Sequence, residues 1–433
     1  MTRMAAILGM LFIPGLLSAE SVPAKVLSLT QYGITWTFAS PAESGCFITG
    51  DYWVVGPVTV KSVSPEPATG RNGSVVNPIA GDKQGYDDRA HWYDAGFRAT
   101  FPLELKPGQS LVSTASLEKV GDKTPDTVEG QGLRGPLRTA VVLTCLLKAP
   151  PADAFRPAYV GTWKDIFTAS SVKRSLLPGL AAPNPKLVSD VKGLERQLER
   201  IWLDHQKQWV NREMHPLENM PDYGREITNV VSNTALVLML DDPERENNTL
   251  LLRFIQKGID YYGTVRSNDD LWVANGGHNS GRKWPIIFAG LMLGHDGMAK
   301  VKATFQEDQQ TYYGKGFKGQ KVLWTIAPDG ANVKHEESNP DKWESFGQGA
   351  NNGSKAESYR RLNGPTWGGE ALAARLMGAL ELWNHQEFFE YVDRWCDEEK
   401  PKFSNPFVVS MWNAYRAKAD EFGRTSSNRR REK

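Results

Sequence analysis

Several features are scarce in this sequence. Cysteine occurs only at Cys46, Cys145 and Cys396, which is too few to build a structural zinc site. Neither sign of charge is in excess, since 51 Lys and Arg face 50 Asp and Glu. The net charge of +1 gives no bulk attraction to nucleic acid or to an anionic membrane. Beyond the N-terminus no apolar run reaches the roughly 18 residues of a spanning helix, so membrane insertion is not expected.

The N-terminus has the pattern of a secretory signal peptide. A positive residue near the start is followed by an apolar stretch over 4–17 and by small residues around Ala19. The pattern predicts a signal peptide over 1–19 and a secreted or periplasmic protein of bacterial type. In such an oxidising compartment, Cys46 and Cys145 could form a disulfide that joins the two ends of the N-terminal region.

Residues 24–150 have the pattern of a β-rich domain. Short β-branched or alternating runs are separated by turns rich in Pro, Gly and Asn. The runs cover 50–63, 95–105, 110–120 and 137–148. This spacing predicts a β-sandwich of about 120 residues. The sandwich could be structural, could bind sugar, or could form one wall of an active-site cleft.

Residues 186–421 show a repeated helical pattern. Nearly all-apolar helices are predicted at 227–240, 284–293 and 370–382, each followed by a short turn and an amphipathic helix. An all-apolar helix is buried, whereas a helix with one apolar stripe lies outside. The alternation therefore predicts a catalytic domain built as an incomplete α/α toroid, a ring of inner helices wrapped by outer ones.

Two further segments of the C-terminal half differ from the helical repeats. A long insertion at 307–365, rich in Gly, Asn, Lys and aromatic residues, interrupts them. A loop of this length inside a compact domain is uncommon unless it is functional or partly ordered. The basic segment 424–433 is expected to be a disordered tail.

In such a ring the inner helices all begin at one end, so the loops before them would meet in a single cleft. Helix N-termini and cationic side chains favour an anion there, and aromatic rings can stack on sugar rings. The predicted partner is an anionic polysaccharide that contains uronic acid, with no metal and no cofactor. The candidate substrate-binding residues are Tyr223, Trp272, Asn279, Lys283, Arg360 and Trp367.

A uronic acid polymer can be cleaved by β-elimination. A base removes the C5 proton, neutralisation of the carboxylate stabilises the enolate-like intermediate, and an acid protonates the departing C4 oxygen. His278 is a suitable base, because imidazole titrates near neutrality. Tyr359, followed by two arginines that favour a phenolate, is the second proton-transfer group. The carboxylate would be neutralised by Asn229 or Asn279 with Arg282 and Arg361.

The combination of a β-domain with α/α hairpins resembles the α/α-toroid polysaccharide lyases, which include alginate and glucuronan lyases, and so do the two segments NGGHNSGRKWP (275–285) and ESYRRLNGPTW (357–367). In those enzymes an Asn, His and Arg set neutralises the carboxylate, and a Tyr or His transfers the proton. The resemblance implies these roles for Asn229, His278, Arg282 or Arg361, and Tyr359. Many toroid lyases carry the β-domain after the helices, whereas a β-domain that comes first is more similar to some α/α-toroid glycoside hydrolases.

Two other functions remain open. One is a glycoside hydrolase with two carboxylates as acid and base or nucleophile. Its candidates are Asp222, Glu226, Asp270, Glu357 and Glu370. The other is a glycan-binding protein without catalysis. An unsaturated, ultraviolet-absorbing product would distinguish a lyase from both. The oligomeric state is not indicated.

Overall fold

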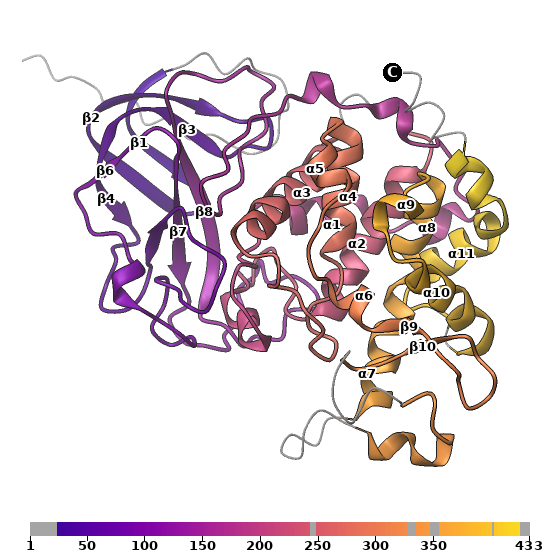
Figure 1. Ribbon diagram of the computed structural model, residues 1–433. Coiled ribbons are helices and arrows are strands. Elements are labelled where there is room, and N and C mark those ends of the chain that lie inside the picture. The colour runs from indigo at the N-terminus through magenta and orange to yellow at the C-terminus, as the bar shows by residue number, and fades with distance from the viewer. Residues whose placement is uncertain (1–23, 243–247, 328–334, 347–354, 401, 425–433) are drawn as a thin grey trace, which may run out of the picture.

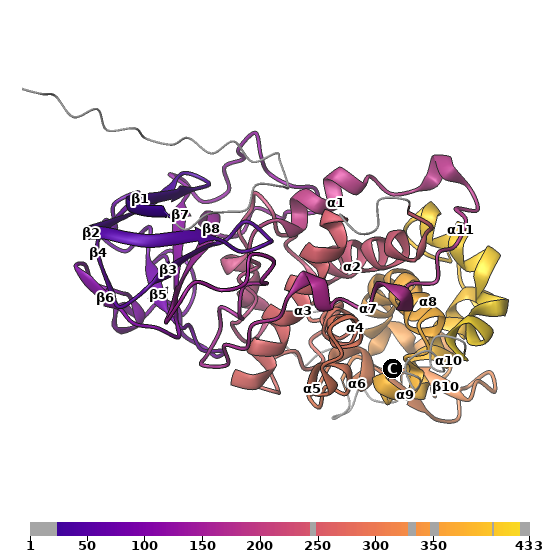
Figure 2. The same ribbon diagram turned by 90° about the horizontal axis from the view of Figure 1, so that it is seen from above.

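The computed structural model describes residues 24–242, 248–327, 335–346, 355–400 and 402–424. The predicted signal peptide lies outside the described residues, as does the predicted tail apart from Arg424. A curled sheet region is followed by a helical region, and the two lie side by side in both views (Figures 1 and 2). The expected order of a β-rich part before a helical part is therefore confirmed.

The β-rich part is one curled sheet of eight strands. Its strands are β1 (Ala24–Gln31), β2 (Ile34–Cys46), β3 (Tyr52–Val55), β4 (Val58–Ser64), β5 (Ser74–Val76), β6 (Leu103–Leu105), β7 (Gln109–Ser116) and β8 (Leu137–Leu146). The order is β5-β7-β8-β3-β2-β4-β6, with β1 paired to β2. A sandwich of two facing sheets is therefore not what forms.

The long strand β2 is the reason for a single sheet. It pairs antiparallel with β1, β3 and β4, so the hydrogen-bonded ladder is continuous where a sandwich would divide. The register shifts between Thr37 and Phe38, and such bulges bend and twist a strand. The curled sheet encloses its own core, which includes Trp36, Phe38, Val54, Val60, Leu111 and Leu143.

The disulfide considered between Cys46 and Cys145 does not form in this structure. Both are free thiols, and so is Cys396. Cys46 ends β2 and Cys145 lies in β8, while β3 is inserted between these two strands and pairs with both. Two cysteines on strands that are not neighbours lie too far apart for the short Cα separation that a disulfide requires.

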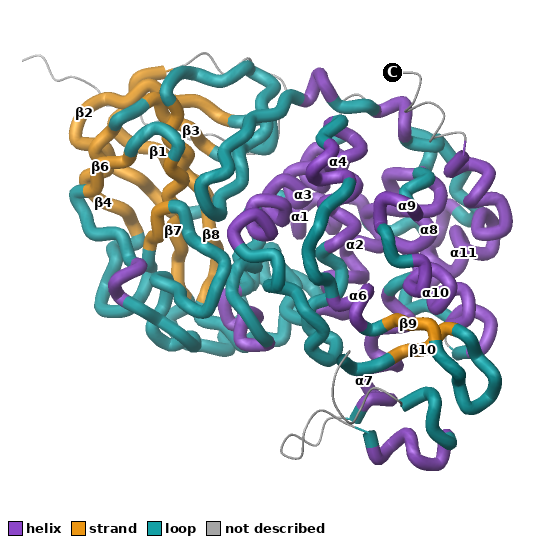
Figure 3. The backbone as a smooth tube through the Cα atoms, viewed as in Figure 1, coloured by secondary structure: helices purple, strands orange, loops and turns teal. Residues whose placement is uncertain are grey.

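The helical region contains α1 (Val191–Leu198), α2 (Gly224–Met239), α3 (Thr249–Ser267), α4 (Lys283–Leu293), α5 (Asp296–Ala299), α6 (Gln306–Gln309), α7 (Ala356–Asn363), α8 (Gly368–Leu376), α9 (Leu380–Trp383), α10 (Gln386–Glu398) and α11 (Pro406–Tyr415). The insertion adds a hairpin of β9 (Thr311–Tyr313) and β10 (Val322–Trp324). Long loops fill the space between sheet and helices (Figure 3). None of the described helices is both long enough and apolar enough to span a membrane.

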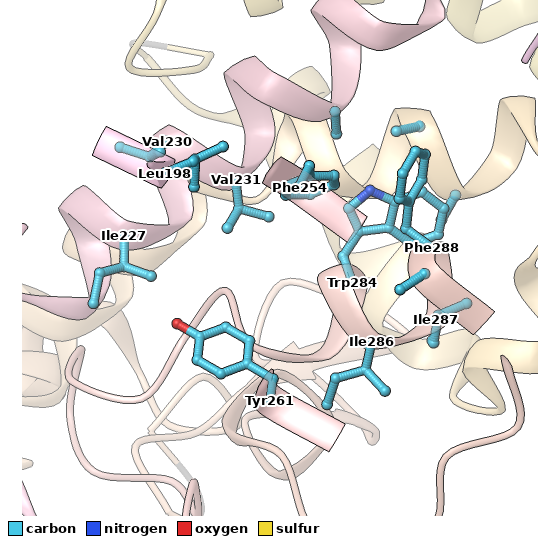
Figure 4. Close-up of a cluster of buried hydrophobic side chains, with 14 of the residues drawn as sticks. Leu198, Ile227, Val230, Val231, Phe254, Tyr261, Trp284, Ile286, Ile287 and Phe288 are labelled. Atoms are coloured by element: carbon cyan, nitrogen blue, oxygen red, sulfur yellow. The ribbon is translucent and has the colours of Figure 1, made fainter. Parts of the chain in front are cut away.

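The three apolar segments form α2, α4 and the pair α8–α9. Their apolar side chains meet those of α3 in one large core, part of which is shown in Figure 4. The third segment is broken because Gly378 has φ +63°, a conformation that ends α8 before α9 begins. Helix α1 ends at Leu198, and residues 201–206 form a buried loop.

Candidate functional site

A groove of about 690 Å³ lies where the sheet region meets the helical region. It is lined by the β7–β8 connection, a 3₁₀ helix (Trp209–Met214), the start of α2, and α7. The lining residues are Gly130, Gln131, Gly132, Arg134, Arg212, Asp222, Tyr223, Arg225, Glu226, Lys355, Ser358, Tyr359 and Leu362. The groove therefore draws on both parts of the chain.

The β7–β8 connection is fixed to the entrance of α2. The backbone N–H of Asp222 donates to the Gly130 carbonyl at 3.1 Å, and Gln131 Nε2 donates to the Met220 carbonyl at 2.9 Å. The approach requires glycine, because a Cβ on Gly132 would lie 2.2 Å from Asp222 Oδ2. The sheet region thus forms one wall of the groove.

Tyr223 and Tyr359 form the centre of the groove. The Tyr359 side chain lies close enough to Tyr223 to affect its protonation, and the Gly277 N–H donates to the Tyr223 hydroxyl at 3.2 Å. Gly276 lets the Tyr359 ring lie against this turn, since a Cβ there would meet Tyr359 Cε1 at 2.6 Å. Burial and then the neighbouring Tyr359 raise the pKa of Tyr223, so Tyr223 keeps its proton at neutral pH.

The groove has a surplus of positive charge. Its charged lining residues are the cations Arg134, Arg212, Arg225 and Lys355 and the carboxylates Asp222 and Glu226. Lys355 also pairs with Glu344 outside the groove, with 2.8 Å between Nζ and Oε2. Arg212 binds both oxygens of Asp222 and lies over the Tyr223 ring, 4.9 Å from its centre. The Arg134 and Arg225 side chains are 55% and 44% exposed, so both can reach a ligand. This surplus favours an anion.

His278 lies against Tyr223 but is not in the groove. The two ring centres are 5.7 Å apart, and His278 is 1% exposed. Neither ring nitrogen has a hydrogen-bond partner among the described residues. Burial, and then Arg282, hold the pKa of His278 well below its usual range. The expectation of a base that touches substrate does not fit this position.

Arg282 and Lys283 are also beneath the surface. The Arg282 guanidinium binds Asp204, with 2.8 Å between Nε and Oδ2, and donates to the His278 carbonyl at 3.0 Å. Lys283 Nζ lies 2.5 Å from Asp308 Oδ2. Arg282 thus binds a buried carboxylate and carbonyls of the turn before α4, and Lys283 binds half-buried Asp308 and the Trp383 carbonyl. They do not line the groove, in contrast to the expectation for this segment.

The other predicted site residues, Tyr223 and Tyr359 apart, also lie outside the groove. Trp272, Asn279, Arg360 and Trp367 are 2% exposed or less. Arg361 is half-exposed, but it binds Glu357 and Glu399 on a face of α7 that does not line the groove. Asn229 is half-buried on α2, and its carbonyl accepts from Asn233. Of the predicted site residues, Tyr223 and Tyr359 are the two that line the groove.

The carboxylates considered for hydrolysis are similarly divided. Asp222 and Glu226 line the groove, and each binds an arginine. Asp270 is exposed and accepts from the Thr304 hydroxyl. Glu357 binds His335 and Arg360, and Glu370 is fully buried without a hydrogen-bond partner among the described residues. Of the five candidate carboxylates, the structure therefore brings only Asp222 and Glu226 together in the groove.

Sequence reasoning missed Arg134, Arg212 and Lys355. Arg134 belongs to the glycine-rich segment GQGLRG (130–135) in the β-rich domain, whose glycines were the one available signal of a close approach. Arg212 belongs to the segment between the β-rich domain and the first predicted apolar helix. Neither could be placed beside Tyr359 without the tertiary fold.

No group of three or more His, Cys, Asp or Glu that could hold a metal is found within the described ranges. In comparisons with known proteins, no family model, no curated protein and no solved structure matches the chain.

Proposed function

We propose that this protein is a secreted or periplasmic polysaccharide lyase that cleaves a uronic-acid-containing polymer by β-elimination in the groove. The observation that carries the proposal is that two neighbouring tyrosines, Tyr223 and Tyr359, line a groove in which arginine and lysine outnumber the carboxylates. Such a lining supplies proton-transfer groups and charge neutralisation together, which are the two requirements of the reaction.

The roles follow from exposure and protonation. The exposed heads of Arg134 and Arg225 bind the sugar carboxylate and stabilise the enolate-like intermediate. Tyr359, which lines the groove from α7, is the base that takes the C5 proton. A C4–C5 double bond forms as the C4–oxygen bond breaks. Tyr223, which keeps its proton, donates it to the departing oxygen.

In the same proposal His278 acts as a positioning residue. Its ring lies 5.7 Å from that of Tyr223, and the turn that contains it donates the Gly277 N–H to the Tyr223 hydroxyl. A neutral, buried imidazole packs against the Tyr223 ring and holds it in place without placing a charge next to the phenol.

The finer fold assignment, an incomplete α/α toroid, belongs to this proposal. It is supported by contacts between segments that precede different inner helices. A Cβ on Gly224, the first residue of α2, would lie 2.3 Å from the His278 carbonyl oxygen before α4. About two turns further along α2, the Ser232 hydroxyl donates to the Thr366 carbonyl before α8. The start of α2 therefore lies beside the turn before α4, and the middle of α2 lies beside the start of α8.

The test is a screen of alginate, glucuronan, pectate, hyaluronan, heparin-like and ulvan polymers, with ultraviolet absorbance as the readout. With the polymer that is cleaved, Tyr359→Phe should reduce turnover by about 100-fold or more while affinity changes little, because only the proton-transfer hydroxyl is removed. Tyr415→Phe is the matched control, since this hydroxyl donates to the Ala181 carbonyl, away from the groove.

Two results would contradict the lyase. Reducing sugar released from a neutral polymer, with no absorbance from any anionic one, would indicate a hydrolase built on Asp222 and Glu226. Binding of an anionic polymer without any product would indicate a glycan-binding protein.

A further inference from the structure

A second feature for recognising sugar polymers lies on the β9–β10 hairpin of the insertion. The strands pair antiparallel, with Val322 opposite Tyr313. The turn GKGFKGQK (314–321) carries lysines at every third position, 315, 318 and 321, and all three are exposed. Phe317 is 53% exposed and Tyr313 is 51% exposed. Exposed aromatic rings among cations are a combination that requires explanation.

The turn is ordered by its own hydrogen bonds. The Gly314 N–H donates to the Lys321 carbonyl, and the Gly316 N–H to the Gln320 carbonyl, both at 2.9 Å. The Phe317 N–H donates to the Glu336 carbonyl at 3.0 Å. These bonds fix the backbone of Phe317 while its ring stays in solvent. A ring held in this way loses little conformational freedom on binding, so a ligand gains most of the contact energy.

The lysines of this turn are not neutralised by the protein. Lys315, Lys318 and Lys321 form no ion pair with any residue that the structure describes. The nearby carboxylates are engaged elsewhere: Glu337 accepts from the Tyr312 hydroxyl at 3.3 Å, Glu390 accepts from the Tyr313 hydroxyl at 2.9 Å, and Glu336 binds Arg394. The turn therefore presents three available positive charges.

Contacts connect the hairpin to the helix that lines the groove. Lys318 Nζ lies 5.9 Å from the centre of the Trp343 ring, and Trp343 lies 4.9 Å from the ring of His335. His335 Nε2 is 3.1 Å from Glu357 on α7. Tyr359, on the same helix, lines the groove. Figure 1 shows α7, β9 and β10 on the same side of the helical region.

We propose that the hairpin tip, residues 313–321, is a second binding site for an anionic polysaccharide, separate from the groove. The lysines bind the carboxylates or sulfates spaced along the polymer, and the Phe317 ring packs on the apolar face of a sugar. The site goes beyond the proposed lyase activity, because binding here requires no chemistry in the groove. Its function is to hold a polymer chain that extends past α7.

The experiment measures binding of alginate and of heparin to the whole mature chain by titration calorimetry. The test variants are the triple change Lys315→Ala, Lys318→Ala, Lys321→Ala and the single change Phe317→Ala. We expect the triple variant to bind its polymer at least about 10-fold more weakly, and Phe317→Ala about 5-fold more weakly. Lys25→Ala, Lys61→Ala, Lys148→Ala removes three exposed lysines of the sheet region as the matched control and should bind normally.

The outcomes separate this site from the lyase proposal. In the background of Tyr359→Phe the hairpin effect should persist, because catalysis is not required. If the wild type cleaves no polymer, but the triple variant still binds more weakly than the wild type, the lyase proposal is overturned and the hairpin site is retained. Equal affinity of the wild type and the triple variant, or no binding of either polymer by the wild type, would overturn the hairpin site. Lysine-dependent binding to phosphatidylglycerol vesicles instead of polysaccharide would also overturn it.

Discussion

Burial sets the protonation of two histidines, His205 and His278. His205 and His278 are each 1% exposed. Burial lowers the pKa of His205 to about 4, against an opposing effect of Asp204. Burial likewise lowers the pKa of His278. Both imidazoles are therefore neutral in the folded protein at pH 7, and protonation of either places a charge in a buried site.

This protonation predicts a loss of stability in mild acid. The unfolded chain binds a proton at each histidine near pH 6.5, whereas folded His205 does so only near pH 4. Stability is therefore fully present above about pH 6.5 and falls as the pH decreases towards 4. His205 alone should account for about 2 kcal/mol between pH 6.5 and pH 5.

Urea unfolding of wild type and His205→Gln at pH 7 and pH 5 measures this contribution. The variant should lose less stability than the wild type over that interval. His91→Gln is the control, because the side chain of His91 is 56% exposed. An equal loss in wild type and His205→Gln would show that the imidazole is protonated in the folded state.

At the scale of elements, glycine sets the distance between α3 and α4. A Cβ on Gly258 would lie 2.2 Å from the Pro285 carbonyl oxygen and 2.4 Å from the Ala289 Cβ. Neither neighbour can move freely, since both lie within the buried helix α4. Close contact between the two helices therefore depends on the missing side chain at this position.

Gly258→Ala should consequently destabilise the protein by about 3 kcal/mol, because an extra methyl group must push two packed helices apart. Gly81→Ala is the matched change in open space, with no heavy atom within 4 Å of the added Cβ, and should cost less than about 1 kcal/mol. Thermal unfolding compares the two variants. Equal stability of both would mean that α3 and α4 can separate without loss.

At the scale of the whole molecule, one arginine joins the two parts of the chain. Arg156 is 1% exposed and binds Asp51 between β2 and β3, with 2.7 Å between Nε and Oδ2. The same guanidinium binds both oxygens of Asp260 on α3, at 2.9 and 2.7 Å. The sheet and the helices are thus connected through one buried cation, and the groove lies at their junction.

Arg156→Met should lower the free energy of unfolding by about 3–5 kcal/mol, because two carboxylates remain buried without their cation. The combined change Arg156→Met, Asp51→Asn, Asp260→Asn should recover part of this loss. Arg196→Met, which removes an exposed pair with Asp126, should cost at most about 1 kcal/mol. An Arg156 variant as stable as the Arg196 variant would contradict the role of this cation.

Local patterns in the sequence determined the order of a β-rich part and a helical part, and the positions of α2, α4 and α8. Periodicity and turn residues are local properties, so a single chain reveals them. Tyr359 and Tyr223 could also be predicted as site residues from local sequence, because both precede apolar helices. The curled sheet was not, since the pairing of β3 between β2 and β8 depends on contacts distant in sequence.

The tertiary structure alone decided which polar residues reach the surface. Arg282 and His278 occupy the expected loop, yet Asp204, in a distant loop, draws the Arg282 guanidinium inward. Arg134 was assigned to the β-rich domain, yet the fold places it in the groove with Tyr359. A cation can bind substrate or compensate a buried carboxylate, and the choice depends on where its partner lies in space. The sequence determined which groups are available, and the long-range packing determined which of them line the groove.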